Sequence, residues 1–115
     1  MEIWHNPRCS KSRAAKQALD GAGREYTERS YLDQPPPAVE LDAVLDRLGK
    51  QPWEITRMNE PVARELGMAT WEHDRERWIA ALVAHPVLIQ RPIVLTDDGR
   101  AVLARTPEEV EEALG

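Results

Sequence analysis

The stretch that decides the fold is Ile3-Trp4-His5-Asn6-Pro7-Arg8-Cys9-Ser10-Lys11-Ser12-Arg13. It predicts a short apolar strand, an Asn-Pro turn and a helix, with the only cysteine of the chain, Cys9, where the helix begins. Unpaired backbone N–H groups and the positive end of the helix dipole stabilise a thiolate there and can hold an anion. Three basic residues crowd the same loop: Arg8, Lys11 and Arg13. We interpret the stretch as a reactive cysteine in an oxyanion pocket.

The spacing around Cys9 argues against two other kinds of cysteine site. A lone cysteine is more often a small buried hydrophobic residue, but the strand, the turn and the flanking cations favour a reactive thiol. A phosphatase-type loop would carry its arginine where this chain has Ala15, whereas the arginine stands at Arg13. A dithiol redox centre needs Cys-x-x-Cys, and the second position is Ser12.

Composition bounds the class of protein. The 115 residues are enough for a single domain, residues 1–115, with a hydrophobic core. Twenty acidic and fifteen basic residues give a net charge of −5, which argues against nucleic acid as a partner. No apolar run approaches the ~20 residues of a membrane span, and the N-terminus lacks the pattern of a signal peptide. A single cysteine forms no internal disulfide. We therefore expect a cytoplasmic protein that does not bind membranes.

The first third of the chain predicts a βαβ unit. A strand is expected over residues 2–5 and a helix from Ser10, followed by the stop signals Gly21 and Gly23. A second strand is expected over residues 26–32, so a right-handed parallel crossover follows. The apolar face expected for the helix consists of Ala14, Ala15, Ala18, Leu19 and Ala22.

Helical patterns fill the middle of the chain and a hairpin follows. Helices are expected from Pro37 to Gly49, as short turns over residues 52–66, and from Thr70 or Asp74 to just before Pro86. The last of these should bury Trp71, Trp78, Ile79, Leu82 and Val83. Strands over residues 93–95 and 101–103 are joined by an Asp-Asp-Gly turn at residues 97–99. A capping box at residues 106–109 then starts a last helix, with Val110, Ala113 and Leu114 facing inward.

The order of residues His-Asn-Pro-x-Cys-x-x-Ser-Arg, from His5 to Arg13, resembles the N-terminal motif of the glutaredoxin-coupled arsenate reductases. The resemblance extends to residues 88–94 and 105–108. It implies an α/β thioredoxin-like fold: a β-α-β and β-β-α core with a mixed four-stranded sheet and a helical insertion. The core would comprise residues 1–33 and 86–115, and the insertion about residues 37–85.

The resemblance also implies an anion site made by arginines. Arg57, Arg91 and Arg105 match the family's oxyanion-binding positions in their local sequence context. Guanidinium groups suit a tetrahedral oxyanion because their planar fork binds two oxygens at once and keeps its charge. Pro92 would form a cis peptide bond with Arg91, opposite Cys9.

The remaining motif residues carry roles around Cys9. His5 in its cationic form could lower the pKa of the thiol, or it could be a strand-end histidine with a local hydrogen bond; both alternatives are open. Ser12 could donate a hydrogen bond to the thiolate. Asn6, Ser12 and Arg13 are expected to shape the loop. We expect no metal site, because the other histidines are isolated in the sequence.

The implied activity is reduction of arsenate to arsenite. Cys9 would attack arsenic held by the arginines, glutathione would serve as co-substrate, and glutaredoxin would remove the resulting disulfide; no bound cofactor is needed, and a monomer is expected. Three alternatives stay open. One is a regulator of the Spx type that binds RNA polymerase, which usually carries Cys-x-x-Cys. Another is a monothiol glutaredoxin or iron–sulfur carrier, and the last is a thioredoxin-fold thiol protein without arsenate activity.

Overall fold

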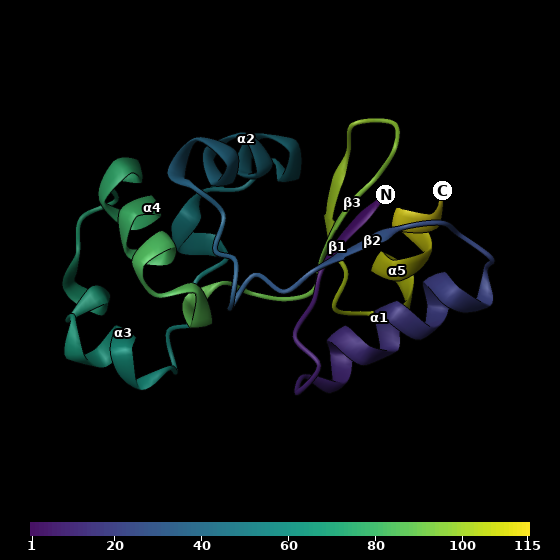
Figure 1. The fold of residues 1–115 in the computed structure, drawn as a ribbon. Coiled ribbons are helices and arrows are strands. Elements are labelled where there is room, and N and C mark those ends of the chain that lie inside the picture. Colours follow the sequence, from purple (N-terminus) through teal and green to yellow (C-terminus); the bar gives the residue numbers. More distant parts are fainter. The chain divides into compact units, whose positions relative to one another are not determined.

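Four strands of three residues each form one mixed sheet in the computed structural model, which describes residues 1–115. They are β1 (Glu2–Trp4), β2 (Thr27–Arg29), β3 (Ile93–Leu95) and β4 (Ala101–Leu103), in the order β2-β1-β3-β4. β1 pairs parallel with β2 and antiparallel with β3, and β3 pairs antiparallel with β4. The predicted mixed four-stranded α/β fold is confirmed (Figure 1).

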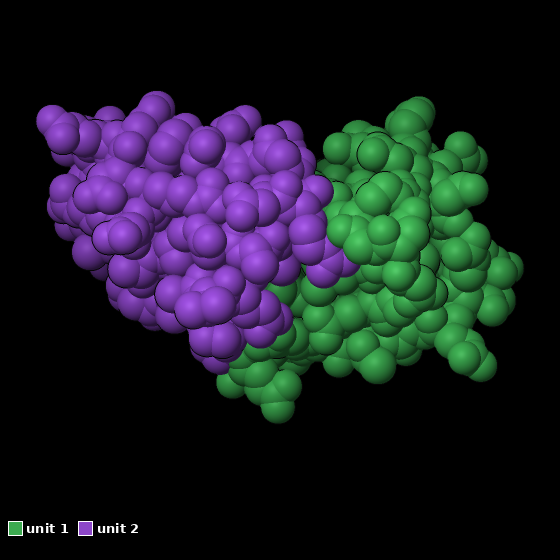
Figure 2. All heavy atoms as spheres, turned by 90° about the horizontal axis from the view of Figure 1, so that it is seen from above, with its two compact units in different colours: residues 1–34, 91–115 green, residues 35–90 purple.

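The chain divides into two compact units (Figure 2). The sheet unit comprises residues 1–34 and 91–115, and the helical unit comprises residues 35–90. The helical insertion expected over residues 37–85 falls inside the helical unit. No helix of the structure is both long enough and apolar enough to cross a membrane.

Two helices cover one face of the sheet in the sheet unit. They are α1 (Ser10–Gly21) and α5 (Pro107–Leu114), which contact each other, and α5 also contacts β4. Side chains from both helices and the sheet form one buried cluster: Ile3, Ala15, Leu19, Val94, Val102, Ala104 and Ala113. Burial of this apolar face is the main force that holds α1 in place. The start of α1 is thereby fixed at the end of β1.

The helical unit contains α2 (Ala38–Leu48), α3 (Pro61–Glu65) and α4 (Arg75–Ala84), with single 3-10 turns at Pro52–Glu54, Met68–Thr70 and Pro86–Leu88. Gly49 ends α2 in the left-handed conformation, with φ of 67°, which glycine adopts without steric cost. α4 begins after Asp74, whose carboxylate accepts a hydrogen bond from the N–H of Arg77. Trp71 therefore lies before the helix rather than on it.

Two further sequence predictions were wrong in detail. The buried face of α1 consists of Ser12, Ala15 and Leu19, whereas Ala14 and Ala22 are exposed. The face is rotated because the Ser12 hydroxyl has buried hydrogen-bond partners, which periodicity of apolar residues cannot reveal. The second strand is shorter than expected, because a turn begins at Ser30, where Asp33 and Gln34 both donate their N–H groups to the Ser30 carbonyl.

Candidate active site

Cys9 lies at the junction of β1 and α1, as the N-cap residue of the helix. A tight turn leads into it: the Cys9 N–H donates to the carbonyl of Asn6 at 3.0 Å, and the Arg13 N–H donates to the Cys9 carbonyl at 3.0 Å to begin the helix. The side chain is partly exposed and makes no capping hydrogen bond of its own. The sulfur is therefore available at a helix N-terminus.

The surroundings of the sulfur lower the pKa of the Cys9 thiol. Partial burial raises it, but the backbone N–H of Ser12, the Arg91 side chain and the backbone N–H of Lys11 outweigh that effect. These donors favour the thiolate because they bind or attract negative charge. The net shift is toward a thiol that ionises more readily than a free cysteine.

Arg91 is the cation that faces this thiol. It lies two residues before the start of β3, and its peptide bond to Pro92 is cis, as the family resemblance implied. Nε and Nη1 of the guanidinium are buried and have no hydrogen-bond partner. Buried guanidinium donors without partners are costly in a native protein and call for an explanation. The natural explanation is an anion that binds beside Cys9.

Arg105 reaches the same place through the backbone of Arg91. Its Nη1 donates to the Arg91 carbonyl at 2.6 Å, and its own N–H donates to Oε1 of Glu109 at 3.2 Å. The Lys11 ammonium is 3.4 Å from the Arg105 carbonyl. The structure therefore places Arg105 against the backbone of Arg91, the residue whose side chain faces Cys9.

Arg57 lies in the helical unit, between the turn at Pro52–Glu54 and α3. Its Nε is 3.3 Å from Oε1 of Glu60, and its N–H donates to the carbonyl of Leu88 at 2.7 Å. The residue thus has a partner inside its own unit. Its membership of the anion site remains a prediction.

The loop residues have the local hydrogen bonds expected of them. Asn6 is buried, and its Oδ1 accepts from the N–H of Arg8 at 3.0 Å. The exposed Arg13 donates from Nη1 to the carbonyl of Pro7 at 2.8 Å. Together these bonds hold the turn that presents Cys9.

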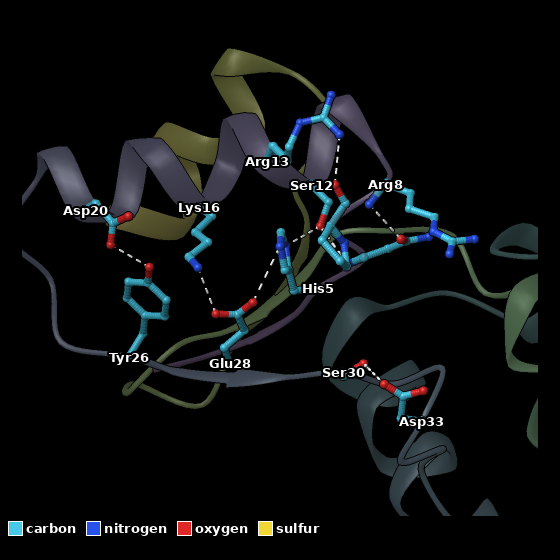
Figure 3. A network of polar contacts seen from close by, with 12 residues as sticks. His5, Arg8, Ser12, Arg13, Lys16, Asp20, Tyr26, Glu28, Ser30 and Asp33 are labelled. Atoms are coloured by element: carbon cyan, nitrogen blue, oxygen red, sulfur yellow. Dashed lines mark hydrogen bonds and ion pairs between the residues drawn. The ribbon is translucent and has the colours of Figure 1, made fainter.

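His5 and Ser12 form a buried pair behind the loop (Figure 3). His5 Nδ1 is 2.7 Å from the Ser12 hydroxyl, which also accepts from the N–H of Asn6 at 3.0 Å. Burial lowers the pKa of His5; the charge of Glu28 opposes the shift, while Lys16 and Arg13 add to it. A lowered pKa makes the imidazole neutral near pH 7. The geometry favours the local hydrogen bond among the two alternatives for His5.

Sequence reasoning missed Glu28, the second partner of His5. Its Oε1 is 3.5 Å from His5 Nε2, and its Oε2 is 2.9 Å from the Lys16 ammonium. The signal lies in strand register, since Ile3 pairs with Glu28 when β1 and β2 run parallel. Neither that register nor the contact between the strands is visible in a local pattern.

A groove of about 620 Å³ runs between α1 and α5 in the sheet unit. Its lining includes Ser10 and Lys11, the two residues after Cys9, and apolar side chains such as Ala14 and Val110. No group of three or more His, Cys, Asp or Glu side chains is placed to bind a metal ion.

Comparison with known proteins gives consistent matches along the chain. The model of the ArsC family matches residues 4–113. A protein of Streptomyces viridochromogenes named "Uncharacterized protein in glnII region" is 55% identical, over 99% of this chain and 98% of its own length. An arsenate reductase of Neisseria meningitidis is 37% identical, over 99% of this chain and 97% of its own length.

A solved structure also matches the fold along almost the whole chain. The arsenate reductase from Vibrio cholerae superposes with a TM-score of 0.85 at 32% identity, covering 99% of this chain and 96% of that one. The thioredoxin-like fold expected from the resemblance is thereby confirmed. With the family model and these relatives in agreement over almost the whole length, the chain belongs to the ArsC family.

Proposed function

We propose that this protein reduces arsenate to arsenite, with Cys9 as nucleophile and glutathione and glutaredoxin as the outside reductants. The observation that carries the proposal is the Arg91 guanidinium, which faces the Cys9 thiol while two of its buried nitrogens have no partner. A tetrahedral oxyanion bound there would satisfy those donors and bring its central atom to the sulfur. The arsenate reductases among the relatives support arsenate as that oxyanion.

The first step joins sulfur to arsenic. The Cys9 thiolate attacks arsenic(V), an As–S bond forms, and one oxygen leaves as water after it takes up protons. The lowered pKa of Cys9 supplies the thiolate without a separate general base. Arg91 and Arg105 stay charged throughout and hold the negative oxygens, with Arg57 as a further predicted contributor.

The second step supplies the electrons. Reduction of arsenic(V) to arsenic(III) takes two electrons, and Cys9 is the only cysteine of the chain. A glutathione thiolate attacks the Cys9 sulfur, an S–S bond forms, and the As–S bond breaks with its electron pair going to arsenic, which leaves as arsenite. A glutaredoxin thiolate then attacks the glutathione sulfur and releases the Cys9 thiolate.

The mouth of the site suits such a partner. Lys11, Arg8 and Ser10 are exposed near Cys9 in the sequence, and Ser10 and Lys11 also line the groove between α1 and α5. The cationic side chains match the carboxylates of glutathione, and the apolar groove gives its backbone a surface. We place the glutathione where Ser10 and Lys11 line the groove.

The test is arsenite formation by the purified protein with arsenate, glutathione and reduced glutaredoxin. We expect arsenite to form catalytically, and omission of glutaredoxin to leave a mixed disulfide of glutathione on Cys9, seen as a mass increase of the intact protein. The Cys9→Ser variant is the control and should do neither. Absence of arsenite, or repeated turnover with thioredoxin alone and no glutathione adduct, would contradict the proposal.

A further inference from the structure

Glu28 occupies a particular position behind the candidate active site. It lies on β2, opposite Ile3 of the parallel β1, and its two carboxylate oxygens have different partners (Figure 3). Oε1 is 3.5 Å from Nε2 of His5, and Oε2 is 2.9 Å from the Lys16 ammonium. One carboxylate oxygen is thus bound by Lys16 of α1, and the other faces the imidazole of His5.

These contacts determine which atoms of His5 and Ser12 carry the protons of their hydrogen bonds. A carboxylate only accepts hydrogen bonds, so its charge favours the proton of a neutral His5 on Nε2, the nitrogen that faces it. Nδ1 is then an acceptor, and the Ser12 hydroxyl 2.7 Å away must donate to it. The Ser12 oxygen keeps its lone pairs for the N–H of Asn6, which lies 3.0 Å away. With the proton of His5 on Nε2, the side chains of Glu28, His5 and Ser12 and the N–H of Asn6 all have hydrogen-bond partners.

We propose that Glu28 is a positioning residue that fixes the Nε2–H tautomer of His5, and through it the Ser12 hydroxyl and the loop that presents Cys9. The importance of this role for catalysis rests on the proposed function. The Ser12 hydroxyl is committed to His5 and does not serve the thiolate. Cys9 is stabilised by the backbone donors of the helix start and by Arg91, and Glu28 keeps the loop in the register that aims those donors.

The charges around His5 are compatible with this assignment. Glu28 faces it from β2, and Lys16 and Arg13 lie on the α1 side. The two cations and burial disfavour a protonated imidazole, whereas Glu28 alone favours it. A neutral ring is therefore retained near pH 7, and the choice that remains is which nitrogen carries the proton. The charge of Glu28 favours the proton on Nε2.

The experiment compares the wild type with Glu28→Gln, and uses Glu25→Gln as the matched control. Glu25 is exposed and lies three residues earlier, so the control removes the same charge from the same segment. Nitrogen NMR of the His5 imidazole reports the tautomer, and the pH dependence of Cys9 alkylation by iodoacetamide reports the thiol pKa. Both readouts use the free protein, so failure of arsenate turnover would contradict the proposed function and leave this test intact.

We expect the proton on Nε2 in the wild type and in Glu25→Gln. In Glu28→Gln the amide no longer selects a tautomer, so the Nδ1–H form should appear. The thiol pKa should rise by about 0.5 to 1 unit, which lowers the alkylation rate near neutral pH by roughly three- to tenfold. Thermal stability should change little, because the Glu28 side chain is 39% exposed.

Two results would overturn the assignment. One is a wild-type His5 that carries its proton on Nδ1, which needs no variant to observe. The other is a Glu28→Gln protein with an unchanged tautomer and an unchanged thiol pKa. Lys16→Met gives a further check, because it leaves the contact between Glu28 and His5 in place and should preserve the wild-type tautomer.

Discussion

The sheet unit and the helical unit treat buried polar groups differently. In the sheet unit four polar side chains are buried, and three of them belong to the motif around Cys9: His5, Asn6 and Ser12; the fourth is Thr96. In the helical unit the one buried polar residue is Thr56, whose hydroxyl donates to the Pro52 carbonyl at 2.7 Å. Most of the buried polar side chains of the sheet unit thus lie around Cys9, whereas the helical unit has a single one.

The two units also differ in how completely a buried or half-buried arginine is paired. Arg75 of the helical unit binds Asp42, Asp46 and Gln51 at 2.8 to 3.0 Å and ties α4 to α2. Arg91 of the sheet unit leaves two buried nitrogens without partners beside a thiol. A paired arginine adds to stability, whereas buried guanidinium nitrogens without partners lower it. The partners of Arg75 give it a structural role, whereas the free nitrogens of Arg91 fit the anion site that we propose in the sheet unit.

The largest expected effect comes from Cys9→Ser. The hydroxyl has nearly the same shape as the thiol, so the fold should remain, but it is a poor nucleophile near neutral pH and cannot join a redox step. Arsenate reduction should fall below detection in a steady-state assay, with unchanged thermal unfolding. Turnover at an appreciable fraction of the wild-type rate would remove Cys9 from the mechanism.

The next effect comes from Arg91→Lys, which keeps the charge but loses the bidentate fork. One charge-assisted hydrogen bond contributes about 1.5 to 3 kcal/mol, so kcat/KM for arsenate should fall roughly ten- to a hundredfold. Arg64→Lys on the exposed surface of α3 is the control and should leave kcat/KM unchanged. Equal, small effects at both positions would mean that the anion site lies elsewhere.

Arg75→Met should show the opposite pattern. It removes the bonds to Asp42, Asp46 and Gln51, so the free energy of unfolding should fall by about 1 kcal/mol, the usual scale for exposed or half-buried ion pairs. Chemical denaturation measures that change. Activity per folded molecule should stay at the wild-type value. A loss of turnover as large as the one expected for Arg91→Lys would contradict a purely structural role for Arg75.

Local signals allowed much of the fold to be predicted. The turn residues at 97–99 and the capping box at 106–109 act within a few residues, and β3, β4 and α5 occur where those signals place them. The end of the second strand and the buried face of α1 were missed, because both depend on hydrogen bonds that the pattern of apolar residues does not reveal: the turn at Ser30 and the partners of Ser12. The buried Ser12 hydroxyl on α1 has its partners just after β1: His5 Nδ1 and the N–H of Asn6.

The sequence predicted some residues of the candidate site and missed others. The position of Cys9 at a helix start follows from a local pattern, whereas Arg91 was expected in the site from the family resemblance. Glu28 carries no local signal, since its contact with His5 depends on the register of two strands. The role of Arg57 follows from the family resemblance and remains a prediction.

The central claim is that the helix start and Arg91 activate Cys9, and the most direct test is the pKa of that thiol. Thiolate absorbance in the ultraviolet is followed against pH for the wild type and for Arg91→Met. Because the helix N–H groups and Arg91 favour the thiolate, the wild-type midpoint should lie below the free value of ~8.5, and it should rise when the guanidinium is removed. A wild-type midpoint at or above ~8.5, or one that Arg91→Met leaves unchanged, would contradict the account.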